Sequence, residues 1–311
     1  MSLAGKRVII SGGAGFLGSY MVERLLGIGA EVTAVDDLST GRVENLKAVM
    51  ENPKFKLMEA DASEVDANGY DIHIHGASIP SPDDYMKRPI KTALSNALGL
   101  LNFLKSSRRV LYMSSSEVYG DPQVIPTPEN YWGNVNPVGQ RSPYDESKRF
   151  GEALCMAFHR EKGVGVKIAR IHNTYGPRMD PQGRYARAIP RFIRQSLKGE
   201  PITIYGDGSQ TRSFTYVDDM VEGLMHLLLS DFSGPINLGS ESEVSVMEVA
   251  NIIKELTGSR SELAFMPLPP DDPKRRRPDI SLARKELKWQ PEVSLREGLG
   301  RTVEWFRGEL R

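Results

Sequence analysis

The chain of 311 residues carries 40 basic and 40 acidic side chains, so its formal net charge is zero. This balance provides no overall field that would attract nucleic acid or an anionic membrane. Cys155 is the only cysteine, which excludes an intrachain disulfide and a cysteine-rich metal site, and we predict no metal. No apolar run is long enough for a membrane span, and the first residues lack a signal-peptide pattern. We therefore expect a cytoplasmic protein that binds neither nucleic acid nor a membrane.

Strand and helix patterns alternate from the first residue onward. The predicted strands are 7–10, 31–35, 55–60, 72–75, 110–113 and 166–170. The predicted helices between them are 16–26, 90–105 and 142–163. This alternation predicts an α/β fold, in which a Rossmann-like, doubly wound parallel sheet has helices on both faces.

The alternation loosens after residue 173, where proline and glycine become frequent. We place one domain at 1–174, with 213–240 returning to it through a helix at 217–229 and a strand at 235–238. A smaller, mainly C-terminal α/β domain for the substrate then comprises 175–212 and 241–311.

Glycines separate the first predicted strand from the first helix, at Gly12, Gly15 and Gly18. Glycine permits a tight turn and lets backbone approach a pyrophosphate, which the helix N-terminus then stabilises. Asp36 ends the second strand, where a carboxylate binds ribose hydroxyls and repels a 2′-phosphate. The pattern predicts NAD as the cofactor, although nearby Arg42 leaves NADP as the alternative.

Asp61 follows the third strand and suits the adenine edge of such a site, with an ordinary strand-end turn as the alternative. The residues predicted to bind the cofactor are Gly12, Gly15, Phe16, Leu17, Asp36, Asp61, Ala62, Ala77, Tyr144 and Lys148.

The stretch SPYDESKRF begins a predicted helix. Ser142 is a good N-cap, Pro143 fits the first helical position and Asp145 can complete a capping box. Tyr144 and Lys148 are then four residues apart on one face. A free tyrosine has a pKa near 10, which makes it a poor base at neutral pH. The lysine ammonium and an oxidised nicotinamide would lower that pKa, so that the phenolate can take a proton from an alcohol.

A serine-rich segment, SSSEVYG, follows the fifth strand directly. Ligands of open α/β sheets bind beyond the carboxyl ends of the strands. The segment therefore brings a hydroxyl, Ser115, and a carboxylate, Glu117, to the edge where the cofactor is expected. Ordinary turn chemistry and a solvated acid are the alternatives.

With these motifs the sequence resembles the extended short-chain dehydrogenases/reductases, and within them the UDP-glucuronate decarboxylases. The resemblance covers nearly the whole chain. The stretches that carry it are GGAGFLGSY, HGASIPSPDDYMKRPIKT, SSSEVYGDPQVIPTPENYWGNVNP, SPYDESKRFGEA, ARIHNTYGPRM, YGDGSQTRSFTYVDD and DDPKRRRPDI.

The resemblance implies decarboxylation of UDP-glucuronate to UDP-xylose through a 4-keto intermediate, with tightly bound NAD recycled. It implies that Tyr144 is the base, Lys148 its partner, Ser115 a contact of the sugar 4-hydroxyl and Glu117 a carboxylate beside the sugar. Related 4,6-dehydratases carry Asp-Glu where this chain has Ser116-Glu117. The implied substrate-binding residues are Tyr85, Ser115, Asn173, Arg178, Arg187, Arg212 and Arg276.

The segment DPQGRYARAIPRF departs from the family pattern and is closer to sugar-nucleotide epimerases. Arg184 and Arg187 in it could meet a substrate carboxylate, and His172 replaces a usual phenylalanine. A UDP-glucuronate or UDP-glucose 4-epimerase is therefore the alternative, and a non-catalytic NAD-binding regulator is a second one. By resemblance we also expect a homodimer, formed through the helices that contain Tyr144 and 90–105.

Overall fold

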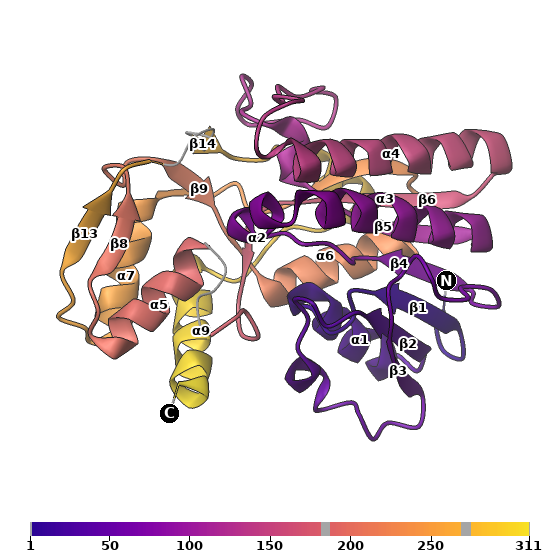
Figure 1. Cartoon of the computed structure of the whole chain (residues 1–311), viewed down its shortest axis with the longest axis horizontal. Helices are drawn as coiled ribbons and strands as arrows, with labels where there is room; N and C mark the ends of the chain where they lie inside the picture. Colours follow the sequence, from indigo (N-terminus) through magenta and orange to yellow (C-terminus); the bar gives the residue numbers. More distant parts are fainter. Residues whose placement is uncertain (1, 182–186, 269–274, 311) are drawn as a thin grey trace.

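Seven parallel strands form the centre of the protein (Figure 1), in a computed structural model that describes residues 2–181, 187–268 and 275–310. In spatial order the strands are β11 (Gly234–Leu238), β6 (Gly165–Ile171), β5 (Arg109–Ser115), β4 (Ile72–His75), β1 (Arg7–Ser11), β2 (Glu31–Asp36) and β3 (Phe55–Glu59). The strand order reverses between β1 and β4, which confirms the predicted doubly wound fold. Such a reversal places a crevice at the carboxyl ends of the strands.

Helices cover both faces of this sheet, as predicted. α1 (Phe16–Gly27) and α6 (Val217–Leu229) pack together on one face, and α3 (Pro89–Ser106) and α4 (Ser142–Lys162) pack together on the other (Figure 1). β11 pairs in parallel with β6, so the late segment returns to the large sheet as expected. Because both faces are covered, the central strands are almost wholly buried and rich in branched apolar residues.

The start of α4 differs from the prediction. Arg141, not Ser142, occupies the N-cap position, and its side chain makes no capping hydrogen bond, so the predicted capping box with Asp145 is absent. The helix begins one residue earlier than predicted, because the Arg141 carbonyl already accepts the Asp145 amide over 3.2 Å and Ser142 therefore lies within the first turn. Pro143 does lie in the first turn, where its missing N–H costs nothing.

The remaining elements are short or belong to a second, smaller α/β unit (Figure 1). Those near the large sheet are η1 (Val43–Leu46), α2 (Pro82–Lys87), η2 (Ser116–Tyr119), β7 (Thr174–Tyr175) and β10 (Thr215–Tyr216). Those of the smaller unit are α5 (Ala188–Lys198), β8 (Ile202–Tyr205), β9 (Thr211–Ser213), β12 (Glu243–Ser245), α7 (Val246–Thr257), β13 (Leu263–Met266), β14 (Arg275–Arg276) and α9 (Leu295–Glu309). α8 (Ser281–Leu287) packs instead against β11 and α6. β8 pairs with β13, β9 lies between β12 and β14, and α7 packs against α5 and α9.

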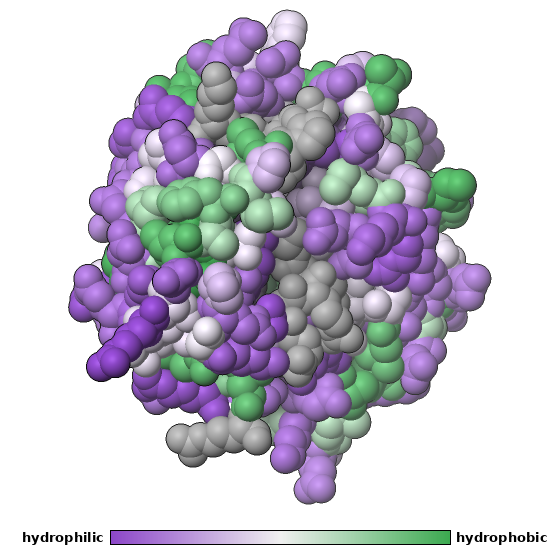
Figure 2. Space-filling model, turned by 60° about the vertical axis from the view of Figure 1, so that its left-hand side comes forward, coloured by the Kyte–Doolittle hydropathy of each residue, from purple (hydrophilic) through white to green (hydrophobic). Residues whose placement is uncertain are grey.

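Hydrophilic side chains predominate on the face shown in Figure 2, where apolar ones are confined to separate patches. Among the described residues, no helix combines the length and apolar character that crossing a membrane requires.

Candidate functional site

A cavity of about 530 Å³ lies at the carboxyl ends of the central strands and extends toward the smaller unit. All the residues of the predicted cofactor-binding and substrate-binding sets, together with Glu117, line it. On the nucleotide side these are Gly12, Gly15, Phe16, Leu17, Asp36, Asp61, Ala62 and Ala77. On the other side they are Tyr85, Ser115, Glu117, Tyr144, Lys148, Asn173, Arg178, Arg187, Arg212 and Arg276. The chain therefore brings together residues from both of its units around one space.

The glycine turn leaves no room for side chains. A Cβ at Gly12 would lie 2.8 Å from the backbone nitrogen of Ala77, and Gly12 has a positive φ of 72°. A Cβ at Gly18 would lie 2.0 Å from the Gly12 carbonyl oxygen. Gly15, at the N-cap of α1, provides no side-chain cap, so the helix begins with amide groups turned to the cavity side. This cradle suits an anionic group such as a pyrophosphate.

Asp36 is buried at the end of β2, and its two carboxylate oxygens accept backbone amides from Ala14 over 2.9 Å and Leu38 over 3.0 Å. Burial raises the pKa of this carboxyl, while those amide bonds oppose the shift. Asp36 thus also fixes the glycine turn, a role that its spacing did not reveal. Arg42 lines the same part of the cavity and lies 3.5 Å from Glu309 of α9.

Asp61 holds its own turn, since its carboxylate accepts from the Ser63 amide over 2.9 Å and from the Ser63 hydroxyl over 2.7 Å. The turn role that sequence left open is therefore real, and the same residue lines the cavity.

Tyr144 and Lys148 lie one turn apart on α4, with the Lys148 ammonium 5.8 Å from the Tyr144 ring centre. Lys148 is only 2% exposed, and its Nζ donates to the Met113 carbonyl over 2.9 Å. Burial lowers the pKa of Lys148 to about 7. Burial likewise raises the pKa of Tyr144 to about 12, although a hydrogen bond with Ser115 opposes the shift. In the protein alone, burial therefore outweighs the expected lowering of the phenol pKa.

Glu117 is clamped between two arginines. Arg141 donates to its carboxylate over 2.7 Å, and Arg276 forms a two-pronged ion pair with it. Burial alone would raise the pKa of Glu117, but the two guanidinium groups outweigh it and hold the pKa at about 2. Glu117 is therefore ionised at neutral pH and has no proton to give. The Ser115 hydroxyl accepts the Glu117 amide over 3.2 Å, which begins η2.

Tyr85, on α2, covers the ring of Tyr144. Its ring stacks on that of Tyr144, with centroids 5.0 Å apart and planes at 13°. The Tyr85 hydroxyl is buried without a hydrogen-bond partner. A buried polar group without a partner destabilises the folded protein, so a hydrogen bond from this hydroxyl to a ligand would be favourable.

The predicted substrate arginines have different surroundings. Arg178 donates to Glu23 of α1 over 2.6 Å and stacks over Tyr20, so much of its charge is already compensated. Arg212, on β9, donates to the Thr211 carbonyl over 2.8 Å. Arg187 precedes α5, and its charge lowers the pKa of Tyr144. Arg184 and Lys274 lie outside the described residues.

Asn173 follows β6 and its amide Nδ2 lies 3.4 Å from the Ser213 carbonyl. His172 beside it is buried, and burial together with the charge of Arg276 lowers its pKa to about 3. The histidine is therefore neutral.

Sequence reasoning missed Arg141 and Arg191, which also line the cavity. Arg141 forms an ion pair with Glu117, which is 24 positions away in the chain, and no rule of sequence spacing predicts such a pair. Arg191 lies over the ring of Tyr205 at 4.7 Å from its centre.

Residues 8–239 match the NAD dependent epimerase/dehydratase family. UDP-glucuronic acid decarboxylase 1 of Arabidopsis thaliana is 47% identical over 98% of this chain and 70% of its own length. UDP-glucuronic acid decarboxylase 5 of the same plant is 46% identical over 98% of this chain and 90% of its own length.

Among solved structures, the UDP-glucose 4-epimerase of Thermotoga maritima, determined with UDP-glucose, is 31% identical and has a TM-score of 0.90 over 98% of this chain and 100% of its own. The UDP-glucuronic acid 4-epimerase of Bacillus cereus, determined with UDP-glucuronic acid and NAD, is 27% identical and has a TM-score of 0.88 over 97% of this chain and 99% of its own. The chain belongs to the NAD dependent epimerase/dehydratase family, the extended short-chain dehydrogenases/reductases.

Proposed function

We propose that the protein is a UDP-glucuronate decarboxylase, which converts UDP-glucuronate to UDP-xylose and CO₂. The observation that carries this proposal is the identity of 46–47% to several UDP-glucuronic acid decarboxylases over nearly the whole chain. The cavity supports it, because it combines a glycine cradle, a Tyr/Lys pair and several arginines. The glycine cradle suits the pyrophosphate of NAD, the Tyr/Lys pair suits proton removal from an alcohol, and the arginines suit an anionic sugar nucleotide.

NAD is the cofactor that fits this cavity. Because Gly12 and Gly15 carry no side chain, the tightly packed glycine turn would let backbone amides approach the pyrophosphate of NAD. Asp36 would accept a ribose hydroxyl beside its amide bonds, and Lys148 would bind the nicotinamide ribose. Bound there, NAD would supply a reversible hydride acceptor for C4 of the sugar and would be regenerated in each cycle.

Tyr144 acts as the base that takes the proton of the sugar 4-hydroxyl. Its ionisation is hindered by burial, so it depends on the positive charges of Lys148 and of the oxidised cofactor. The Ser115 hydroxyl, which bonds Tyr144, would align the 4-oxygen.

Loss of CO₂ follows from the chemistry of the substrate. A 4-keto sugar with a carboxylate on C5 is a β-keto acid. The bond from C5 to the carboxyl carbon breaks, CO₂ leaves, and the electron pair moves to the ketone oxygen as an enolate. Ser115 and the nearby arginine charge would stabilise that oxyanion before C5 takes up a proton.

Arg276 and Arg212 would bind the diphosphate. Both terminal nitrogens of Arg276 bond Glu117, so its buried Nε, which has no hydrogen-bond partner, would be the donor to a phosphate oxygen. We also propose the division of labour expected from sequence, in which 1–174 with 213–240 bind NAD, and 175–212 with 241–311 bind the sugar nucleotide.

A homodimer through α3 and α4 completes the proposal. Ile90, Leu94 and Leu98 are exposed at intervals of four residues on α3, and Phe150 is exposed on α4. Such a stripe beside two packed helices suits a four-helix contact with a second copy.

A 4-epimerase is the second candidate, because UDP-glucuronic acid 4-epimerase is a structural neighbour at 27% identity. The test is NMR of the purified protein with UDP-glucuronate and NAD⁺, following the anomeric signals and CO₂. UDP-xylose with CO₂ is the expected result. UDP-galacturonate without CO₂ would replace the proposal by the epimerase, and no reaction would refute both.

A further inference from the structure

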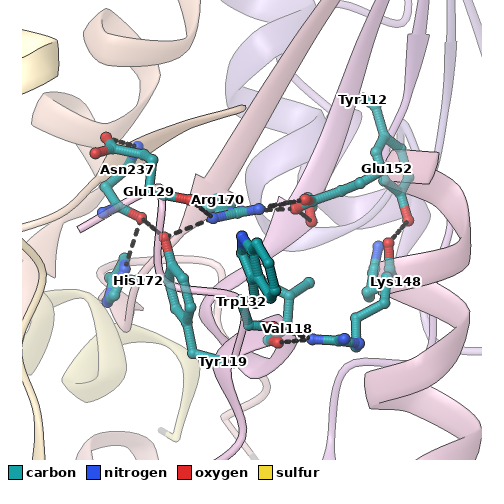
Figure 3. Close-up of polar contacts among 12 residues, drawn as sticks. Tyr112, Val118, Tyr119, Glu129, Trp132, Lys148, Glu152, Arg170, His172 and Asn237 are labelled. Carbon is teal, nitrogen blue, oxygen red and sulfur yellow. Dashed lines mark hydrogen bonds and ion pairs between the residues drawn. The ribbon is translucent and has the colours of Figure 1, made fainter. Parts of the chain in front are cut away.

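A buried chain of polar contacts runs from α4 across the central sheet (Figure 3). Glu152 of α4 and Arg170 of β6 form a two-pronged ion pair, with Nε to Oε1 at 2.9 Å and Nη2 to Oε2 at 2.6 Å. Their side chains are only 12% and 11% exposed. Ser114 of β5 donates its hydroxyl to the same Glu152 Oε1 over 2.6 Å. The carboxylate is thus fixed from two neighbouring strands.

Arg170 is itself fixed at its other end. Its Nη1 donates to the Tyr119 hydroxyl and to the Glu129 carbonyl, both over 2.8 Å. The Tyr119 hydroxyl then donates to Asn237 Oδ1 of β11 over 2.8 Å, as Figure 3 shows. Because every link is hydrogen-bonded and at least partly buried, the Glu152 carboxylate has little freedom to move.

Glu152 follows Lys148 by four residues on α4, so both side chains lie on one face of the helix. Two consecutive residues of β5 hold them. The Met113 carbonyl accepts the Lys148 ammonium over 2.9 Å, and Ser114 holds the Glu152 carboxylate. A largely buried carboxylate is therefore held on the same face of α4 as a buried ammonium, one helical turn away.

The other groups around these two side chains are neutral or already paired. Lys148 faces the Tyr112 ring of β5 at 5.2 Å, Tyr144 of its own helix, and His75 of β4, whose pKa burial lowers to about 3. Glu152 faces Arg170 of β6, Tyr119 of η2, and Tyr112 and Cys155, whose pKa values burial raises. The charge of Glu152 raises the pKa of Lys148, against the effect of burial.

We propose that Glu152 is a positioning residue for the reaction. Held by Arg170 and Ser114, it keeps the Lys148 side chain in its ammonium form, which Tyr144 needs to act as a base. The inference rests on the proposed function for its catalytic meaning, whereas the charge of Lys148 can be measured without substrate.

A purely structural reading has to be distinguished from this one. In that reading, the Glu152–Arg170 ion pair only stabilises the packing of α4 on β6. Its loss would then lower the free energy of unfolding and leave the charge of Lys148 unchanged. Glu152→Gln keeps the shape and the contact with Ser114 but removes the charge. Glu161→Gln is the matched control, because Glu161 lies on the same helix and is 74% exposed.

The experiment is a pH titration of ¹³Cε-lysine signals in the whole protein with NAD⁺, in which Lys148→Met assigns the Lys148 signal. We expect the midpoint of Lys148 to fall by about one pH unit in Glu152→Gln, since a nearby opposite charge has an effect of that order. Glu161→Gln should leave it unchanged, and Glu152→Asp, which retains a carboxylate, should shift it less. In Glu152→Gln the pH at which kcat/KM begins to fall on the alkaline side should be lowered by the same amount as the Lys148 midpoint.

An unchanged Lys148 midpoint in folded Glu152→Gln would overturn the proposal, even if its Tm fell. Should that variant not fold, an unchanged midpoint in Glu152→Asp together with an unchanged pH profile would overturn it. If the wild-type protein did not turn over UDP-glucuronate, the proposed function would fail, and the titration would still decide whether Glu152 controls the charge of Lys148.

Discussion

The ring of Tyr85 lies flat on the ring of Tyr144, with centroids 5.0 Å apart. The helix α2 thus covers the proposed base with an aromatic side chain whose hydroxyl has no partner. The buried hydroxyl without a partner lowers the stability of the protein alone, and the same hydroxyl could bond a bound substrate.

Tyr85→Phe should separate these two effects. The variant keeps the ring stack and removes the unpaired hydroxyl, so the free protein should gain up to about 1 kcal/mol in the free energy of unfolding. KM for UDP-glucuronate should rise at least several-fold, because the substrate loses a partner. Urea unfolding and steady-state kinetics measure the two quantities. A loss of stability with unchanged KM would contradict the role given to this hydroxyl.

Tyr144→Phe should abolish turnover while NAD remains bound. The phenol oxygen is the only part removed, and loss of a general base typically costs a hundredfold or more, roughly 10²–10⁴. Single-turnover kinetics and the NAD content of the purified protein check this. Tyr70→Phe is a suitable control, because Tyr70 bonds Thr33 and does not line the cavity. An active Tyr144→Phe variant would exclude Tyr144 as the base.

The sequence predicted those parts of the fold that depend on local patterns. Runs such as 7–10 and 217–229 have the periodicity of one element and became β1 and α6. The glycines of the first turn also carry a local signal, because a side chain at Gly12 or Gly18 would collide with backbone.

Relationships between distant residues could not be predicted in this way. The clamp of Glu117 by Arg141 and Arg276 joins residues up to 159 positions apart, and only the folded chain brings them together. The cap of α4 was wrong by one residue for a local reason, since the helix begins at the Arg141 carbonyl and Ser142 lies inside its first turn. Ionisation also depends on burial, which sequence spacing does not reveal, and burial raises the pKa of Tyr144 in the protein alone.

The stability of the protein should depend on pH through Lys148. Its pKa in the folded state is about 7, below the usual value of 10.5, so above pH 7 the unfolded chain binds more protons than the folded one. The contribution of Lys148 to the free energy of unfolding therefore rises with pH between about 7 and 10.5. Urea unfolding at pH 7 and pH 9 should show the wild type gaining stability relative to Lys148→Met. Parallel changes in the two proteins would show that Lys148 has an ordinary pKa.

Glu117→Gln should destabilise the protein by about 3 kcal/mol. Removing the carboxylate leaves the charges of Arg141 and Arg276 close together and buried, and breaking a buried ion pair has a cost of this size. The folded pKa is about 2, below the unfolded one, so the contribution of Glu117 is present above pH 4.5 and is lost as the pH falls toward 2. Urea unfolding at pH 7 measures the first effect. Glu255→Gln, in an exposed pair with Arg296, should cost less than about 1 kcal/mol and is the control.

The exposed stripe on α3 should control the oligomeric state. Leu94 is 50% exposed in the middle of this stripe, between Ile90 and Leu98. A charge there would be buried without a partner in the proposed four-helix contact, so Leu94→Glu should convert the homodimer to a monomer. Light scattering after size exclusion measures the mass. Val138→Glu is the matched control, because Val138 is 90% exposed outside α3 and α4 and should leave the mass unchanged. A wild-type mass of one chain, or a dimer that survives Leu94→Glu, would place the contact elsewhere.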